Sequence, residues 1–272
     1  MARTRLLMTI RLAACAVAAM VAAGCAAPPL SPADQALLTA ARRGDVDEAK
    51  KALAAGANVN AQDSLSGDTA LMRAAGFNHA AVARALLEAG AKPDVRRQNN
   101  TTALHDAAAE GHAEVVTLLV NARATVDARG GEGDQTPLAR AVDNARADAV
   151  RELLEAGASI KTIVLADFVT MSLGNSRGAA TVQIVSALMG AGADVEARNS
   201  SGETALGAAA HWCHLPFSRE VAQALIAAGA SLAAKDRDAR TPAEHVRLKV
   251  QEHTGDYKAR CEGLLAVLPA QP

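Results

Sequence analysis

The side chains best suited to chemistry gather near the C-terminal end of this 272-residue chain. His211, Cys213 and His214 are close in sequence, and His245 and Cys261 follow further along. The two cysteines are either disulfide partners or small apolar side chains that pack as thiols. A metal site is a third alternative, but His-x-Cys-His is not a standard zinc signature, and such a site needs four converging ligands. We therefore take Cys213 and Cys261 as the candidate disulfide and expect no bound metal.

The sequence lacks the common catalytic motifs. It has no Gly-x-Ser-x-Gly elbow, no glycine-rich phosphate loop before a helix and no His-Glu-x-x-His pair. The run Gly130-Gly131-Glu132-Gly133 follows no apolar strand, so we interpret it as a flexible hairpin tip. We expect no catalytic residues, no cofactor and no enzymatic activity.

The composition favours a helical, folded protein. Half of the residues are hydrophobic (50%) and 21% are charged, which excludes wholesale disorder. Aromatic residues make up only 2%, and an interior filled with Ala and Leu is typical of helices. The formal net charge of −1 and the scarcity of stacking rings argue against nucleic acid as a partner.

An export signal is predicted at the N-terminus. Residues 1–24 carry three arginines, no acidic residue and the apolar run 12–23, the pattern of a secretory signal peptide. Residues 21–25, Val-Ala-Ala-Gly-Cys, resemble the bacterial lipobox, with Ala in place of the usual Leu. This resemblance implies lipidation of Cys25, a short Pro-rich tether over 25–32 and an outer-membrane anchor facing the periplasm. The alternative is plain cleavage, which would leave a soluble periplasmic or secreted protein.

The remainder of the chain repeats two markers. The string Leu-Leu-x-Ala-Gly-Ala occurs at residues 86–91 and 153–158, and successive copies of its Gly position are 34, 33, 34, 35 and 37 residues apart. A Thr-x-Leu marker precedes several of these copies, at Thr69, Thr102, Thr136 and Thr204. A fixed period of this length is the signature of a repeat protein.

The Thr-Pro-Leu-His-like start and the Gly-Ala finish resemble the ankyrin repeat over residues 33–269. The resemblance implies an all-α solenoid of about seven helix-turn-helix units with short β-hairpin-like loops, each unit burying its apolar face on its neighbours. The fifth unit lacks the Thr-x-Leu start, and the sixth carries about four extra residues, where Pro216 should bound a helix. The units are 33–62, 63–96, 97–128, 129–161, 162–195, 196–234 and 235–269.

Most histidines have structural interpretations. His79, His105 and His112 fall where the ankyrin pattern places histidines, so we expect structural hydrogen bonds from them rather than catalysis. His253 lies beside Glu252 and is interpreted as part of a solvated charge pair.

The resemblance implies that partners bind the hairpin tips and the outward ridge of the first helices. Five residues occupy one equivalent ridge position before the inter-helix turn, and two of them are aromatic: Arg43, Phe77, Glu110, Asn144 and Trp212. Trp is a favoured interface anchor, although Trp212 could instead pack under the insertion 214–217. The tips add a mostly polar rim of Leu65, Asp68, Gln98, Asn99, Thr101, Gln135 and Glu203.

These observations predict a monomeric protein-binding scaffold of the bacterial cell envelope that binds a protein through its concave face. Its partner would be an envelope enzyme or toxin that it inhibits or stabilises, and its contact with the membrane would be limited to the lipid anchor. The alternative from another class is a redox or metal-binding protein centred on Cys213, Cys261 and His211. A third is a degenerate enzyme with a pocket in the irregular fifth unit, to which no residues can be assigned.

Overall fold

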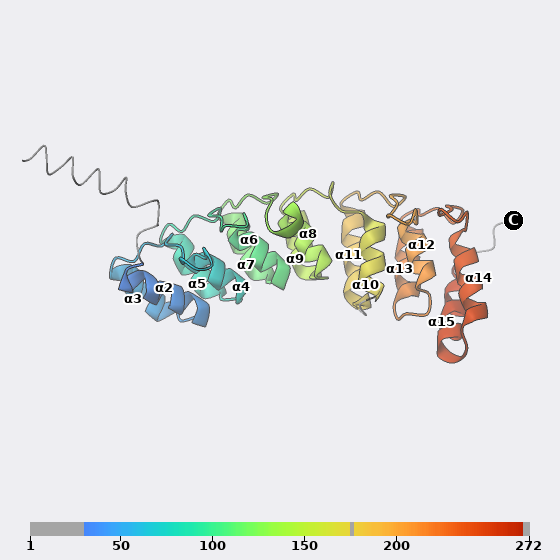
Figure 1. Cartoon of the computed structure of the whole chain (residues 1–272), viewed down its shortest axis with the longest axis horizontal. Helices are drawn as coiled ribbons and strands as arrows, with labels where there is room; N and C mark the ends of the chain where they lie inside the picture. The colour runs from blue at the N-terminus through green and yellow to red at the C-terminus, as the bar shows by residue number, and fades with distance from the viewer. Residues whose placement is uncertain (1–29, 175–176, 269–272) are drawn as a thin grey trace, which may run out of the picture.

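The structure, a computed structural model, describes residues 30–174 and 177–268. Within these residues fourteen α-helices form seven consecutive pairs, which stand side by side in one row with the connecting loops along one edge (Figure 1). The predicted all-α solenoid is confirmed. The first helices of the pairs are α2 (Pro32–Arg43), α4 (Ala70–Gly76), α6 (Ala103–Glu110), α8 (Pro137–Asp143), α10 (Leu165–Gly174), α12 (Ala205–His211) and α14 (Pro242–Glu252). The second helices are α3 (Val46–Ala54), α5 (Ala80–Glu88), α7 (Ala113–Asn121), α9 (Ala147–Glu155), α11 (Gly178–Gly190), α13 (Ser218–Ala227) and α15 (Gly255–Leu265).

The predicted signal peptide and the lipidation site Cys25 lie outside the described residues. None of the described helices has the length and apolar character that crossing a bilayer requires.

The first helices begin where the Thr marker predicts. The hydroxyl of Thr69 accepts a hydrogen bond from the N–H of Met72 at 3.2 Å, and the threonines that open α8, α12 and α14 do the same. At the other end, Gly44 and Gly111 adopt the left-handed conformation with φ of 78° and 81°. This conformation reverses the chain between the two helices of a pair and suits glycine because it has no Cβ.

Two series of hydrogen bonds link segments about one repeat apart along much of the solenoid. In the first series, a side chain just after the turn between the two helices of one unit bonds a carbonyl oxygen at the C-terminal end of the first helix in the preceding unit. The bond supplies a donor to a carbonyl group that has no partner within its own helix. These bonds are His79 Nε2 to Arg42 O (3.0 Å), His112 Nε2 to Gly76 O (3.1 Å), Arg146 Nε to Ala109 O (3.1 Å) and Arg177 Nη1 to Asp143 O (2.9 Å). On the loop side, a carboxylate or amide oxygen accepts from the backbone about one repeat further on, as in Asp94 with Thr125 (2.8 Å), Asp127 with Ser159 (2.9 Å) and Glu196 with Ser231 (2.7 Å).

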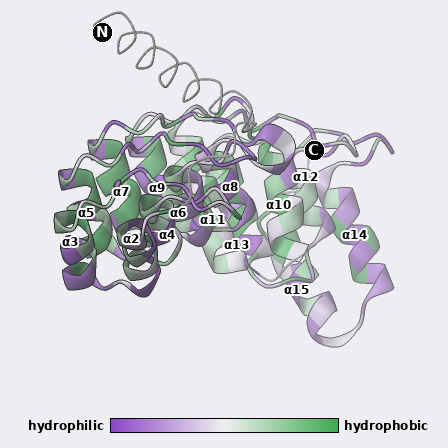
Figure 2. Cartoon of the chain, turned by 60° about the vertical axis from the view of Figure 1, so that its left-hand side comes forward, coloured by the Kyte–Doolittle hydropathy of each residue, from purple (hydrophilic) through white to green (hydrophobic). Residues whose placement is uncertain are grey.

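Leucines and small alanines fill the spaces between pairs. Leu71, Leu104, Leu138 and Leu206 occupy the same position two residues after the marker Thr, and each is at most 1% exposed. Figure 2 shows that the central helices are mostly hydrophobic, whereas α14 and the loops carry many hydrophilic residues. A polar terminal helix is what a finite solenoid needs at its end.

The two irregular units depart from this plan as their sequences indicate. Helices α10 and α11 contain 10 and 13 residues, compared with 7 and 9 in α4 and α5. In the sixth unit Pro216 lies in the link between α12 and α13, and Phe217 takes the left-handed conformation with φ of 68°. The insertion therefore displaces the inter-helix turn by several residues from the end of α12.

The glycine run 130–133 is packed closely against the preceding loop and is not an open, flexible tip. Gly131 donates its N–H to Asn99 O at 2.7 Å, and Gly130 pairs with Gln135 as an isolated β-bridge. A Cβ placed on Gly130 would lie 2.3 Å from the backbone oxygen of Asn100. Gly130 is required because two neighbouring loops approach each other closely at this point. The sequence of a single unit does not reveal this contact between units.

Replacing Gly130 with Ala should lower the free energy of unfolding by about 1–3 kcal/mol, because the two loops must move apart. Gly190→Ala is the matched control, since Gly190 ends a helix and a Cβ there meets nothing within 4 Å. The control should be neutral or slightly stabilising. Urea denaturation of both variants measures the difference, and equal stability of the two would contradict the close approach of the loops.

Candidate partner-binding face

The first helices and the loops that precede them form one continuous side of the solenoid, which we call the first-helix face. Each first helix starts near the loops that connect the units, and we call this side of the face the loop edge. It ends at the turn that leads into the second helix of its pair, and we call that side the turn edge. A helix of seven residues such as α4 separates the two edges by about 10 Å.

A network of charges occupies the loop edge of the second and third units. Arg73 forms an ion pair with Asp63, and Arg97 bridges Asp68, at 3.0 Å, and Asp106. Burial raises the pKa of Asp106 to about 6, although the nearby Arg97 opposes this change. The result is a fixed pattern of alternating charges beside the first-helix face.

His105 supports this edge as a neutral ring. Its Nδ1 accepts from the Thr102 N–H at 3.1 Å, and its Nε2 lies 3.1 Å from the carbonyl oxygen of Gln135 in the next unit. Burial lowers its pKa to about 4, so the ring is uncharged at neutral pH. The bonds of His79, His105 and His112 agree with the structural roles predicted for them.

A pocket of about 420 Å³ opens between α8 and α10, where the fifth unit departs from the repeat pattern. Ala139 and Val142 from α8 and Phe168 and Met171 from α10 give it an apolar lining. Polar groups stand around this lining, among them Asp143, whose pKa is raised by burial. The lining of this pocket therefore combines apolar and charged side chains.

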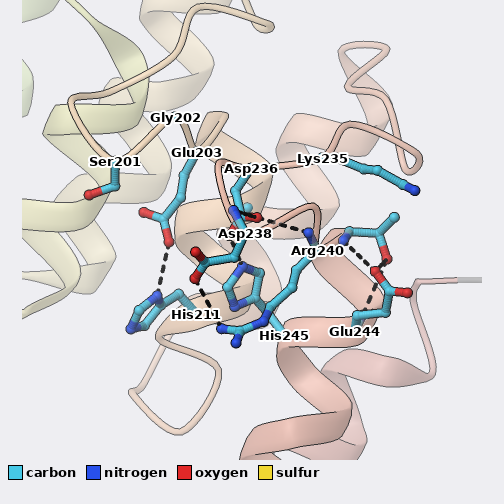
Figure 3. A network of polar contacts seen from close by, with 12 residues as sticks. Ser201, Gly202, Glu203, His211, Lys235, Asp236, Asp238, Arg240, Glu244 and His245 are labelled. Atoms are coloured by element: carbon cyan, nitrogen blue, oxygen red, sulfur yellow. Dashed lines mark hydrogen bonds and ion pairs between the residues drawn. The ribbon is translucent and has the colours of Figure 1, made fainter.

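A second pocket, of about 540 Å³, lies between α12 and α14 and runs from the loop edge to the turn edge. Four of its lining residues form what we call the acid–histidine cluster: Glu203, His211, Asp236 and His245. His211 Nδ1 is 2.9 Å from Glu203 Oε1, and His245 Nε2 is 2.7 Å from Asp236 Oδ2 (Figure 3). The two imidazole rings lie side by side with centroids 5.5 Å apart.

Four of the five predicted ridge residues lie exposed at the turn edge. Each of them directly precedes a left-handed residue, which places them at equivalent positions in their units. Phe77 is 57% exposed. Glu110 and Asn144 also have local partners, Arg146 at 3.5 Å and the carbonyl oxygen of Arg140 at 2.9 Å. The four are Arg43, Phe77, Glu110 and Asn144.

Trp212 differs from these four because the insertion follows it directly. It is half-buried, lines the pocket between α12 and α14, and contacts the rings of His211 and His214 at tilted angles, with centroid distances of 5.4 and 5.9 Å. The hydroxyl of Ser218 donates to its carbonyl oxygen at 2.6 Å, which ties the insertion to the end of α12. Trp212 therefore combines the two expectations: it packs against the insertion and still borders the first-helix face.

Several other expectations need correction. Thr101 and Glu203 of the predicted polar rim are buried, whereas Leu65 is 91% exposed. His253, expected to be solvated beside Glu252, is half-buried, with its ring 5.0 Å from that of His214.

Cys213 and Cys261 are joined by a disulfide bond, with their Cα atoms 4.7 Å apart. A metal centre that uses both thiolates, one of the alternatives derived from the sequence, is therefore wrong for this structure, because each sulfur is bonded to the other. His211 and His245, also candidate metal ligands from the sequence, lie next to each other, and each forms its hydrogen bond with a carboxylate, Glu203 or Asp236.

Comparison with known proteins now identifies the repeat. A family model described as ankyrin repeats (3 copies) matches residues 18–97, 37–130 and 90–163, which together cover more than half of the chain. The chain belongs to the ankyrin repeat family. It is also similar to the human ASB11 ankyrin repeat domain, at 25% identity and a TM-score of 0.66, over 89% of this chain and 99% of that one. No curated protein sequence matches it. Membership of the ankyrin family indicates a protein–protein interaction scaffold, and ankyrin repeat domains are generally non-enzymatic.

The acid–histidine cluster was missed from the sequence, although the repeat register contains a signal for it. Asp63 with Arg73, Arg97 with Asp106 and Asp236 with His245 occupy corresponding positions in three ankyrin units. Aligning the units would have predicted that Asp236 contacts His245. It would not have shown that Glu203, from the preceding unit, joins them.

Proposed function

We propose that this protein is a non-enzymatic scaffold of the bacterial cell envelope that binds a partner protein on its first-helix face, and so inhibits or stabilises an envelope enzyme or toxin. The observation that carries the proposal is where the exposed large apolar side chains lie. Leu65, Phe77, Met171 and Leu248 are on this face or its edges. Among the described residues, the other comparable side chains are Phe217, in the link between α12 and α13, and Tyr257 in α15. Exposed apolar groups concentrated on one side of a soluble domain favour a protein interface there.

The shape and charge of the face support the same proposal. The pocket between α8 and α10 offers a recess lined by both apolar and charged side chains, and the charge network around Arg97 offers fixed polar partners at the loop edge that also carries Leu65. Interfaces combine such an apolar anchor site with a polar rim. Phe77 at the turn edge and Leu65 at the loop edge of the same unit are the proposed anchors.

The envelope location rests on the N-terminal sequence and on the disulfide. The basic and apolar character of residues 1–24 favours export, and a structural disulfide favours an oxidising compartment. We propose that Cys25 carries the lipid anchor.

Capture of proteins from envelope fractions tests the binding proposal. The immobilised full chain should recover a specific protein, and Phe77→Ala should reduce that recovery at least tenfold, as expected for an anchor worth about 1.4 kcal/mol or more. Trp212→Ala should have a smaller effect because half of the ring is already packed within the chain. Glu88→Ala, at an exposed position of α5 on the second-helix side, is the control. Undiminished recovery by both Phe77→Ala and Trp212→Ala would contradict binding at this face.

A further inference from the structure

The acid–histidine cluster brings metal-binding atoms from two units to one buried point. Ligand atoms of Glu203, Asp236 and His245 all lie within 4.8 Å of one another. Their side chains are only 7–8% exposed, so the cluster is a built part of the interior and not a chance gathering of surface charges. The pocket between α12 and α14 opens over it and connects it to solvent.

Both carboxylates are held so that one oxygen of each faces a histidine. Asn199 Nδ2 donates to Glu203 Oε2 at 3.1 Å and leaves Oε1 toward His211. The N–H groups of Asp238 and Arg240 donate to Asp236 Oδ1, at 2.9 and 2.8 Å, and leave Oδ2 toward His245. Orienting one oxygen by an outer hydrogen bond while the other faces inward is how proteins position carboxylate ligands for metals.

The donor set of the cluster also suits a cation. Glu203 and Asp236 each turn one carboxylate oxygen toward a histidine, and His211 and His245 each offer one imidazole nitrogen there. Carboxylate oxygens and neutral imidazole nitrogens are both common metal ligands.

The competing explanation for the acid–histidine cluster is a set of purely structural ion pairs, and such pairs are present in other units. At the corresponding positions Arg73 pairs with Asp63, and Arg97 with Asp106. A guanidinium stays protonated and cannot bind a metal, whereas a neutral imidazole can. The seventh unit has His245 in place of such a residue, and the sixth adds a second carboxylate–imidazole pair directly beside it. Among the described residues, Glu203, Asp236 and His245 are the only group of three or more possible metal ligands, and His211 contacts this group through Glu203.

We propose that Glu203, Asp236 and His245, with His211 as the fourth ligand, form a zinc-type divalent metal site that joins the sixth and seventh units. Two imidazole nitrogens and two carboxylate oxygens suit Zn²⁺ at about 2.0–2.2 Å from each ligand. The metal takes the place of the hydrogen bonds between each ring and its carboxylate. The proton on each bonded ring nitrogen moves to the other nitrogen of that ring or, from an imidazolium ring, to solvent. This inference goes beyond the proposed scaffold function and does not depend on it.

Zinc titration of the untagged full chain tests the site. Cys15 and Cys25 are replaced by Ser so that free thiols take up no metal, while the Cys213–Cys261 disulfide is kept. Calorimetry with Zn²⁺ should give one ion per chain. His245→Gln, which keeps a hydrogen-bonding side chain near Asp236, and Glu203→Gln should each weaken binding at least tenfold. His253→Gln is the control, because this half-buried histidine lies outside the cluster.

A second measurement keeps the test independent of folding defects. Co²⁺ bound to the unmodified cluster should give the visible absorption of a four-coordinate site without sulfur-to-metal charge transfer, and Glu203→Gln should remove it. Zinc affinity that is unchanged in both His245→Gln and Glu203→Gln would overturn the proposal. So would an equal loss in His253→Gln, or a Co²⁺ spectrum identical to that of the hydrated ion.

Discussion

Removal of the Cys213–Cys261 disulfide should lower the free energy of unfolding of the C-terminal units by about 2–4 kcal/mol. The bond joins Cys213, in the link that follows α12, to Cys261 in α15 across 48 residues of sequence, so it restricts a long loop in the unfolded chain. The last pair of a solenoid contacts a neighbour on one side only, so it has fewer compensating contacts than a central pair. The loss should therefore be concentrated in α14 and α15.

Hydrogen exchange of a Cys213→Ser/Cys261→Ser variant measures this effect unit by unit. Amides of α14 and α15 should exchange markedly faster, whereas those of α6 and α7, several units away, should keep their protection. Uniformly faster exchange along the chain would show that the solenoid unfolds as one cooperative block, and no change would show that the bond does not stabilise the last unit.

Leu104→Ala should destabilise the protein by about 2–5 kcal/mol, the range for a large-to-small change in a packed core. Leu104 is fully buried in α6, and this helix packs against α4, α7 and α8. The substitution would therefore leave a cavity in the core between neighbouring helices. Loss of contact in a central unit also weakens its coupling to the neighbours on both sides.

Leu65→Ala is the control for this change, because it removes the same atoms from a side chain that is 91% exposed. Its effect on the unfolding free energy should stay within about 0.5 kcal/mol. Chemical denaturation of both variants gives the comparison, and similar losses at the two positions would mean that the stacked core is not formed as described.

The ankyrin pattern predicted the helices because its signals act within a few residues. The hydroxyl of Thr69 caps the N-terminus of α4, which begins at the next residue. Gly111 ends α6 in the left-handed conformation and so allows the chain to reverse into α7. Leu104 and its equivalents mark the buried side by their spacing alone. Helix caps, turn glycines and the spacing of buried leucines can all be recognised within the sequence of a single unit.

Contacts between units were harder to predict because they join residues about one repeat apart. The close approach of Gly130 to Asn100 depends on how two loops stack, and the burial of Glu203 depends on the next unit. The insertion after Trp212 moved the left-handed turn to Phe217, and the sequence alone could not decide between an exposed ring of Trp212 and one packed against the insertion. The pairing of Asp236 with His245 was available from the repeat register, but its meeting with Glu203 required the three-dimensional stack.

Site-specific photo-crosslinking in the producing cell is the most direct test of recognition through the first-helix face. A photoreactive phenylalanine analogue in place of Phe77 should form a discrete crosslinked product with one protein, and the same analogue in place of Glu88 on α5 should form none or far less. Crosslinking of the same protein mainly from position 88, with little or none from position 77, would contradict partner binding at this face.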